Sequence, residues 1–291
     1  MTGPHLTTLP HPARSSRPVD RLLDTTNARG LGIWHDVLTL QVDLFVAAEI
    51  AAFGGSSAWQ AAGTVLEAGC GNGRYLAALS RAFPDKRYVG IDRSEELVEL
   101  ANAYRNQRRR FEVADFLDGL EVGTFDAVIM RFVVQHLSDL GALLDRTAAY
   151  LRPGGTLFVI EPDLARSTNT PPTPRFDAML AEYARLAADR GRLRVQLAQL
   201  PALISAMPGW EVVHDIAINV QNYGPFTGSD ILRLYRSWTD LCEQQGAFAP
   251  TFDFAGVRGE LDRWARPNTS RSRIGLRMLE VRRTGALEVQ Q

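Results

Sequence analysis

The sequence predicts an α/β fold built around a mostly parallel sheet. Between residues 63 and 163, short β-branched apolar runs alternate with longer stretches of helical spacing, which is typical of consecutive β–α–β units. Acidic or glycine-rich segments follow the first three runs, at the strand ends where open parallel sheets bind ligands. The connections are short, as compact α/β domains prefer. We therefore expect a Rossmann-like core in residues 63–163.

The pattern places five strands and three connecting helices in this core. Turn signals around β-branched runs predict the strands 64–67, 88–91, 110–113, 125–130 and 155–160. Apolar residues at helical spacing predict the helices 74–83, 94–106 and 138–151. Pro153, Gly154 and Gly155 are expected to stop the last helix and to turn the chain before the fifth strand.

The segments on either side of the core divide the rest of the chain. Residues 1–18 lack the apolar stretch of a secretion signal and are expected to form a disordered tail. Residues 19–62 carry apolar side chains at helical spacing, which predicts one or two helices that form a lid. No apolar run approaches the roughly 20 residues that span a bilayer, so we expect no membrane contact. Residues 164–291 should complete the sheet and cover the site with insertions, through helices at 175–203 and 229–245, strands at 210–220 and 274–283, and an insertion at 246–269.

Composition and charge limit the classes of function. The 291 residues are 45% hydrophobic and 22% charged, which is ordinary for one globular domain with insertions. The formal net charge of −1 provides no general positive field, so we expect a small-molecule substrate and no nucleic acid or anionic lipid. Cys70 and Cys242 are expected to be free thiols, as in a reducing cytoplasm. The oligomeric state stays open, and a homodimer is one arrangement that the sequence allows.

The most specific motif is the segment V-L-E-A-G-C-G-N-G at residues 65–73. Glycines at a strand-to-helix turn permit positive φ and let the backbone approach a ligand closely. A dinucleotide loop has the spacing G-x-G-x-x-G, whereas here the third glycine comes one residue early. The carboxylate of Glu67 would repel a pyrophosphate and would suit the ammonium and sulfonium groups of S-adenosylmethionine. A purely structural glycine turn is the alternative.

Two further acids follow the next two predicted strands. Asp92 ends the second strand, where a carboxylate can accept from both hydroxyls of a ribose. Nicotinamide-binding sites use the same device, and an acid at a helix N-terminus is favoured even without a ligand. Asp115 follows the third strand and can accept from an adenine amine, with Phe116 packed against the base. In register, Glu67, Asp92 and Asp115 would lie at neighbouring strand ends.

Two more motifs stand around the fourth and fifth strands. R-F-V-V-Q-H-L occupies residues 131–137, and L-R-P-G-G occupies residues 151–155. With these motifs, residues 63–163 resemble the core of the class I S-adenosylmethionine-dependent methyltransferases and are similar to the small-molecule branch of that family. The resemblance implies a seven-stranded sheet whose last strand, 274–283, is antiparallel. It also implies S-adenosylmethionine as the methyl donor.

The resemblance implies a role for each matching residue. In the family, the glycines of the first motif contact the methionine part of the donor, the second acid contacts the ribose, and the third acid and its aromatic neighbour contact the adenine. Backbone near Met130 contacts the amino group. Glu67 stands where many relatives carry aspartate, which keeps the charge in place. Residue by residue, the implied cofactor-binding set is Glu67, Gly69, Gly71, Asp92, Asp115, Phe116 and Arg131.

Several patterns argue against other kinds of site. The five histidines do not cluster with carboxylates at metal-ligand spacing, so we expect no metal. His136 is interpreted as a structural residue, and the arginines between residues 105 and 110 as a solvated face. The Asn-Pro-Pro-Tyr type motif of amino-directed nucleic-acid methylases is absent after the fourth strand.

The reaction itself needs few protein groups, because the donor carries the leaving group and the protein aligns the acceptor and excludes water. The candidate catalytic residues are Asp163 at the end of the fifth strand, then Tyr223 and His35, for which packing or a surface position is the alternative. Aromatic residues in the flanking segments favour a flat or apolar metabolite, methylated at carbon, nitrogen or oxygen in a biosynthetic reaction. A non-catalytic S-adenosylmethionine-binding protein with a structural or regulatory role is the rival hypothesis. The glycine spacing disfavours a nicotinamide-dependent oxidoreductase.

Overall fold

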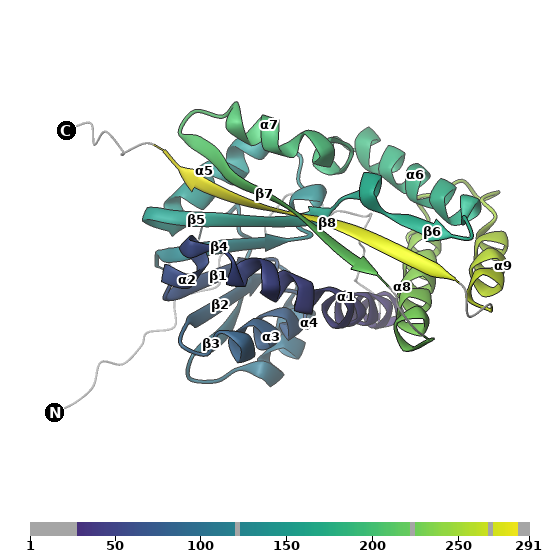
Figure 1. Ribbon diagram of the computed structural model, residues 1–291, viewed down its shortest axis with the longest axis horizontal. Coiled ribbons are helices and arrows are strands. Elements are labelled where there is room, and N and C mark those ends of the chain that lie inside the picture. Colours follow the sequence, from purple (N-terminus) through teal and green to yellow (C-terminus); the bar gives the residue numbers. More distant parts are fainter. Residues whose placement is uncertain (1–27, 120–122, 222–224, 267–269, 285–291) are drawn as a thin grey trace.

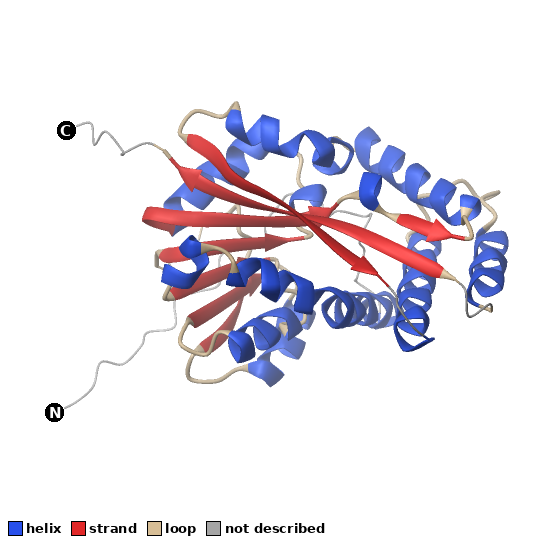
Figure 2. Ribbon diagram, viewed as in Figure 1, coloured by secondary structure: helices blue, strands red, loops and turns tan. Residues whose placement is uncertain are grey.

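The computed structural model describes residues 28–119, 123–221, 225–266 and 270–284, and the predicted tail lies outside them. These residues form one sheet of eight strands with helices on both faces (Figure 1 and Figure 2). The strand order is β3-β2-β1-β4-β5-β8-β6, and β7 pairs along the other edge of β8. The strands are β1 (Thr64–Ala68), β2 (Arg87–Asp92), β3 (Arg109–Val113), β4 (Phe125–Arg131), β5 (Leu151–Pro162), β6 (Thr168–Thr170), β7 (Trp210–Gln221) and β8 (Arg271–Arg283).

The strand directions confirm the predicted Rossmann-like, mostly parallel sheet. The first five strands pair in parallel, with β1 between β2 and β4. β8 runs antiparallel to β5, as expected for the final strand. Because β1 to β4 point the same way, their carboxyl ends meet at one edge of the sheet, where the glycine segment and the acids of the sequence motifs lie.

The helices begin at residues that suit helix N-termini. Ser94 accepts a hydrogen bond from the Leu97 N–H at 3.2 Å, and Asp139 accepts one from the Ala142 N–H at 2.9 Å. The helices are α1 (Ala28–Gly54), α2 (Ser57–Ala61), α3 (Arg74–Ala82), α4 (Glu95–Ala101), α5 (Leu140–Tyr150), α6 (Pro174–Asp189), α7 (Leu200–Ser205), α8 (Pro225–Gln244) and α9 (Phe254–Ala265). Short 3₁₀ segments are η2 (Asn102–Tyr104), η3 (Val134–His136), η4 (Leu164–Arg166) and η5 (Leu193–Gln199).

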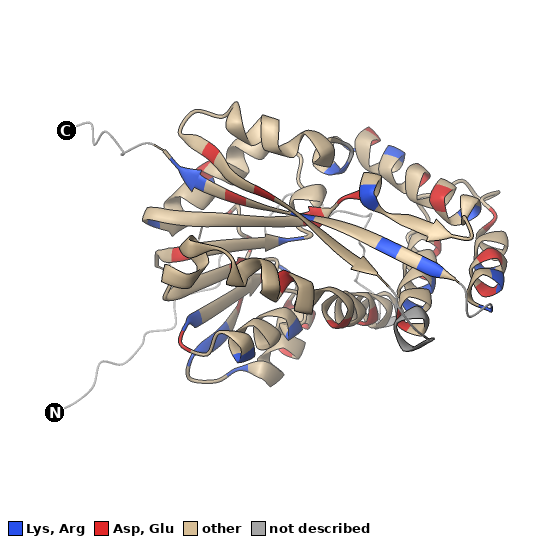
Figure 3. Ribbon diagram, viewed as in Figure 1, with Lys and Arg blue, Asp and Glu red and all other residues tan. Residues whose placement is uncertain are grey.

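The apolar side chains form a layer on each face of the sheet and a third cluster beyond it. Residues of α1, α2 and α3 pack on one face, and residues of α5, η5 and α7 pack on the other. The third cluster joins α6, α8 and α9. Both α6 and α9 carry acidic and basic residues, and Figure 3 shows both signs on each of these helices. The described surface therefore carries charges of both signs on the same helices.

Helix α1 is the main element of the predicted lid. It is one continuous helix of 27 residues, and Val37, Phe45 and Phe53 are buried against the rest of the protein. The expectation of no membrane-length apolar segment was wrong, because Gly30–Gly54 is long and apolar enough to cross a membrane by length and composition. A helix that covers a sheet meets the same criteria, since it too presents a wide apolar face. Figure 1 shows α1 crossing the face of the sheet from α2 towards α8.

Three elements differ from the sequence-based expectation. Residues 153–155 lie inside β5 and do not form a separate turn before it, because the pairing of β4 with β5 shifts register there and absorbs the extra residues. The helix expected at 175–203 is divided into α6, η5 and α7. The insertion at 246–269 contains α9, whose buried face packs against α6 and α8.

Candidate active site

The glycine segment makes a tight turn over the end of β2. The backbone N–H groups of Gly69 and Cys70 both donate to the Ile91 carbonyl, at 2.8 and 2.9 Å. Gly69 and Gly71 have φ of 75° and 51°, a region that costs about 1–2 kcal/mol for residues with a side chain. A Cβ at Gly71 would lie 2.8 Å from Leu38 Cδ1, and one at Gly69 would lie 2.5 Å from Val133 Cγ2. Glycine therefore avoids both backbone strain and side-chain crowding at this turn.

Glu67 is the next-to-last residue of β1, beside this turn, and has an unusual environment. It is 2% exposed, and its Oε2 has no hydrogen-bond partner among the described residues. Burial raises the pKa of Glu67 to about 8, and the nearby carboxylate of Asp92 adds to this, although Arg131 acts in the opposite direction. A buried, unpartnered carboxyl group at a ligand-binding edge is suited to receive a cationic group.

Asp92 connects the glycine turn to the start of α4. Its Oδ2 accepts from the Gly71 N–H and its Oδ1 from the Ser94 N–H, both at 2.9 Å. Desolvation raises the pKa of Asp92, whereas these two backbone donors lower it. Asp92 therefore lies at the turn, as the sequence predicts, and its carboxylate also holds the turn in shape.

Asp115 and Phe116 lie past β3, next to the Asp92 backbone. The Ala114 N–H donates to the Asp92 carbonyl at 2.8 Å, and Asp115 Oδ1 accepts from the Leu117 N–H at 2.9 Å. The ring of Phe116 lies 5.2 Å from that of Tyr150 and is mostly buried. The structure places both residues at the expected edge, and their contact with an adenine stays a prediction.

The side chain of Arg131 is directed towards α1. Its Nε lies 3.0 Å from Glu49 Oε1, and both side chains are almost completely buried. The guanidinium also donates to the Gln41 carbonyl at 3.1 Å and lies over the rings of Tyr75 and Phe132. Because the side chain of Arg131 is occupied in this way, only the backbone of this residue is left to contact the methyl donor. Sequence reasoning missed Glu49, although a lone acid on the apolar face of a helix was the available signal.

His35 lies against the glycine turn from the α1 side. Its Nδ1 is 3.2 Å from Asn72 Nδ2, which also donates to Thr39 Oγ1 at 3.2 Å. With Leu38 next to Gly71, contacts from His35, Leu38 and Thr39, little more than one turn of the helix, place α1 over the donor motif. Tyr223, the other candidate outside the core, lies outside the described residues.

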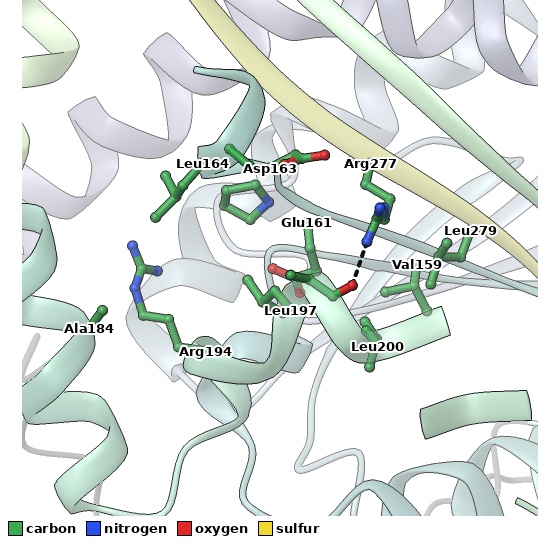
Figure 4. Close-up of a pocket in the computed structure, with 13 residues that line it drawn as sticks. Val159, Glu161, Asp163, Leu164, Ala184, Arg194, Leu197, Leu200, Arg277 and Leu279 are labelled. Carbon is green, nitrogen blue, oxygen red and sulfur yellow. Dashed lines mark hydrogen bonds between the residues drawn. The ribbon is translucent and has the colours of Figure 1, made fainter. Parts of the chain in front are cut away.

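Asp163 lies at a cavity of about 290 Å³ beyond the end of β5, shown in Figure 4. Its Oδ2 accepts from Arg166 Nε at 3.1 Å, and its N–H donates to the Gly275 carbonyl at 2.8 Å. Neither of these two contact partners belongs to the glycine turn. The structure therefore groups His35 with the donor motif and leaves Asp163 at a neighbouring cavity.

The loop after β4 separates the cavity from the glycine turn. Val133 of this loop packs on Gly69, and the next N–H, of Val134, donates to Glu161 Oε1 at 2.7 Å. Glu161 is 3% exposed and lines the cavity, and burial raises its pKa to about 8. Its second oxygen, Oε2, has no hydrogen-bond partner among the described residues. One loop thus contacts both the donor motif and Glu161, a residue that lines the cavity.

The residues at the turn fit S-adenosylmethionine. The unpartnered Oε2 of Glu67 can receive an ammonium group, and the glycines leave room for close approach of the ligand. Asp92 lies where a ribose would meet the carboxyl end of β2. Among the residues that the structure describes, no group of three or more histidines, cysteines or acids could hold a metal ion.

The sheet order and the strand-end acids define a class I S-adenosylmethionine-dependent methyltransferase, and comparison with known proteins agrees. The chain matches the family model described as "Methyltransferase domain" over residues 17–214. It therefore belongs to that family. The solved structures include a putative type II methyltransferase from Anaeromyxobacter dehalogenans, 19% identical, with a TM-score of 0.54 over 81% of this chain and 96% of that one. The plantazolicin methyltransferase BpumL in complex with SAH is 14% identical, with a TM-score of 0.51 over 89% of this chain and 92% of that one.

Curated relatives match a shorter segment. Trans-aconitate 2-methyltransferase from Deinococcus radiodurans is 36% identical over 98 residues, which are 34% of this chain and 37% of the relative. Ubiquinone biosynthesis O-methyltransferase from Xanthomonas campestris is 32% identical over 128 residues, 42% of this chain and 51% of the relative. The match thus spans about half, or less, of the length of these relatives.

Proposed function

We propose that this chain transfers a methyl group from S-adenosylmethionine to a small aromatic or apolar acceptor. The observation that carries the proposal is the buried Oε2 of Glu67, which has no hydrogen-bond partner among the described residues and lies beside a turn whose glycines have positive φ. The curated relatives, named for trans-aconitate and for ubiquinone biosynthesis, support a small molecule as the acceptor class.

Different parts of the site would bind the methyl donor and keep water away from it. When bound, S-adenosylmethionine supplies an electrophilic methyl group on a sulfonium. Glu67 would hold the ammonium group and Asp92 the ribose hydroxyls, which fixes the donor against the turn. Helix α1 covers the turn through Leu38 and His35 and would exclude water from the reacting centre.

The acceptor needs few protein groups, which only have to orient it or move a proton. Asp163 and Glu161 line the neighbouring cavity and can orient an acceptor or hold a proton. His35 lies close to the donor motif and is the other group that can move a proton. We propose that methylation at carbon, nitrogen or oxygen serves biosynthesis of a metabolite in the cytoplasm, with no nucleic-acid or membrane partner and with a homodimer as one assembly.

Calorimetry and a transfer assay test this proposal together. The whole protein should bind S-adenosylhomocysteine and not NADH, and should move label from the methyl donor to a member of an aromatic metabolite panel. Binding without transfer to any compound would favour a non-catalytic, donor-binding role. Binding of NADH in place of S-adenosylhomocysteine would overturn the proposal.

Two glycine variants provide a matched control for that assay. Gly71→Ala should abolish transfer, because the added Cβ meets Leu38 and φ is 51°. Gly154→Ala introduces the same change at φ of 77° with no atom within 4 Å, far from the turn. This control should cost a similar amount of backbone strain and leave transfer intact. Equal loss in both variants would point to general destabilisation.

A further inference from the structure

The cavity beyond β5 combines an apolar wall with a small number of charged groups. Four leucines and a valine from five elements line it together with alanines and a proline, and Figure 4 shows Arg194 and Arg277 on either side of Glu161. A cavity of about 150 Å³ holds a benzene ring. The volume of about 290 Å³ therefore suits one ring or a short aliphatic chain with a polar end.

Two of the charged groups are already neutralised. Arg277 pairs with Asp215 at 3.1 Å and donates to the Ala198 carbonyl at 3.1 Å. Asp163 pairs with Arg166 at 3.1 Å. These pairs leave Arg194 and Glu161 as the groups that decide which ligand the cavity accepts.

Arg194 carries a charge that no carboxylate of the described residues pairs with. It donates to Gln135 Oε1, lies 4.6 Å from the Tyr183 ring, and leaves its Nε buried with no hydrogen-bond partner in the described part of the chain. The partners that it does have are neutral. An arginine held in this way retains the capacity to bind an anion.

Glu161 adds a second polar group without a second charge at neutral pH. Burial raises its pKa to about 8, so the group is mainly protonated at pH 7 and can donate a hydrogen bond. The charged and titratable groups around it are Asp163 just after β5, Arg277 on β8, Arg194 on η5 and His136 on η3. Desolvation lowers the pKa of His136 to about 3, so His136 stays neutral near pH 7.

We propose that this cavity is the acceptor pocket and that it selects a small apolar carboxylic acid, whose carboxylate accepts from Arg194. The assignment as acceptor pocket rests on the proposed methyl transfer. The loop after β4 links the two places, because Val133 packs on Gly69 of the donor motif and the Val134 N–H donates to Glu161, which lines the pocket. The apolar body of the acid would lie against Leu164, Leu197 and Leu279.

Binding of matched acids and amides to the whole protein tests the selection without any methyl transfer. The probes are benzoate and phenylacetate against benzamide and phenylacetamide, titrated by calorimetry at pH 7 with S-adenosylhomocysteine present. The acids should bind roughly ten- to hundred-fold more tightly, the usual range for a charge-assisted hydrogen bond. Equal affinity for acid and amide would overturn the proposal.

Arginine variants assign the effect to one side chain. Arg194→Gln should weaken acid binding to the level of the amides, and Arg194→Lys should recover part of it because the charge is kept. Arg190→Gln is the matched control, since Arg190 is exposed, lies four residues away and does not line the cavity. Acid binding that survives Arg194→Gln would overturn the assignment. If this variant melts below the assay temperature, Arg194→Lys decides alone, through the acid-to-amide ratio.

The pH profile gives a readout that a merely structural role would not change. Acid binding should weaken as the pH rises through about 8, because Glu161 then becomes an anion beside the bound carboxylate. Glu161→Gln should remove this dependence, and the amides should not show it. A flat profile in the unaltered protein would contradict the predicted arrangement.

Failure of the inference and failure of the proposed function are distinguishable. If a neutral compound receives label and acids do not bind, the methyl transfer stands and the acid selection is wrong. If acids bind through Arg194 and never receive label, while another compound does, the cavity is not the acceptor pocket. Label in an acid that depends on Arg194 supports both.

Discussion

Single carboxyl groups determine how the site responds to pH. Glu67 keeps its proton at neutral pH because burial raises its pKa to about 8. A ligand ammonium beside it favours the charged form and lowers that pKa. Ligand binding and proton release are therefore linked at this residue.

We expect S-adenosylhomocysteine to release a proton when it binds at pH 7. The sign follows from the raised pKa: the free protein holds a proton on Glu67 and the complex does not, so affinity should also rise with pH up to about 8. Calorimetry in two buffers of different ionisation enthalpy measures the released protons. Glu67→Gln, which cannot ionise, should bind more weakly and release none. Equal proton release by both proteins would show that another group is responsible.

For Asp92 we expect a loss of affinity, because its carboxylate already accepts hydrogen bonds from the backbone without ligand. Asp92→Ala should weaken S-adenosylhomocysteine binding by about 1–3 kcal/mol, through loss of a charged acceptor for two hydroxyls and of the contact that shapes the turn. Asp85→Ala, an exposed acid just before β2, is the control and should leave affinity unchanged. Unchanged affinity in Asp92→Ala would remove this residue from the site.

At the scale of elements, α1 packs in the apolar layer on the sheet and is also joined to β4 by a buried ion pair. The Glu49–Arg131 pair lies between α1 and β4, and desolvation raises the pKa of Glu49 despite the neighbouring guanidinium. Breaking such a pair leaves one buried charge without a partner. Glu49→Leu or Arg131→Met should each lower the free energy of unfolding by about 3–5 kcal/mol.

The double variant tests whether the loss comes from the unpaired charge. Glu49→Leu with Arg131→Met removes both charges and should be more stable than either single variant, as measured by denaturant unfolding. Additive losses would mean that the two side chains act independently. The surface pair Arg236–Asp262 is a suitable comparison, since exposed pairs contribute at most about 1 kcal/mol.

The two ends of α1 should differ in how they respond to ligand. The end near His35 and Leu38 contacts the glycine turn, whereas the end near Glu49 is held by the buried pair. Amide hydrogen exchange in residues 36–42 should slow when S-adenosylhomocysteine is added, and exchange in residues 45–50 should change less. Identical exchange with and without ligand would make α1 a fixed part of the core.

At the scale of the whole molecule, the parts of the fold that depend on local pattern were predictable. The strand and helix periodicity of residues 63–163 predicts five strands whose cores match β1 to β5. The glycine and acid motifs lie at one edge of that sheet, where donor binding stays a prediction. The sequence pattern does not predict β6, because its three residues carry no periodicity and it pairs with a strand about 100 positions later in the chain. The sequence pattern does not predict α9, because the aromatic, proline and glycine residues around it are typical of a loop.

The grouping of the candidate site residues was predictable only where consecutive strands supply them. Glu67, the glycines and Asp92 come from consecutive strand ends, which the parallel order brings together. The Glu49–Arg131 pair joins residues 82 positions apart, and the cavity collects residues from β5, η5 and β8. Such contacts depend on how helices cover the sheet, which no local spacing in the sequence records.

The position of β8 in the sheet also affects how the protein is made. Ribosomes synthesise chains from the N-terminus, and domains begin to fold as they emerge. β5 and β7 both precede β8 in the chain, yet both pair with it. While the nascent chain ends before residue 271, the donor-binding half can form but β5 exposes an open edge, a surface that invites pairing with other chains. The arrival of β8 covers that edge and joins β7 in one event, so the risk of aggregation during synthesis is concentrated in the interval before this strand emerges.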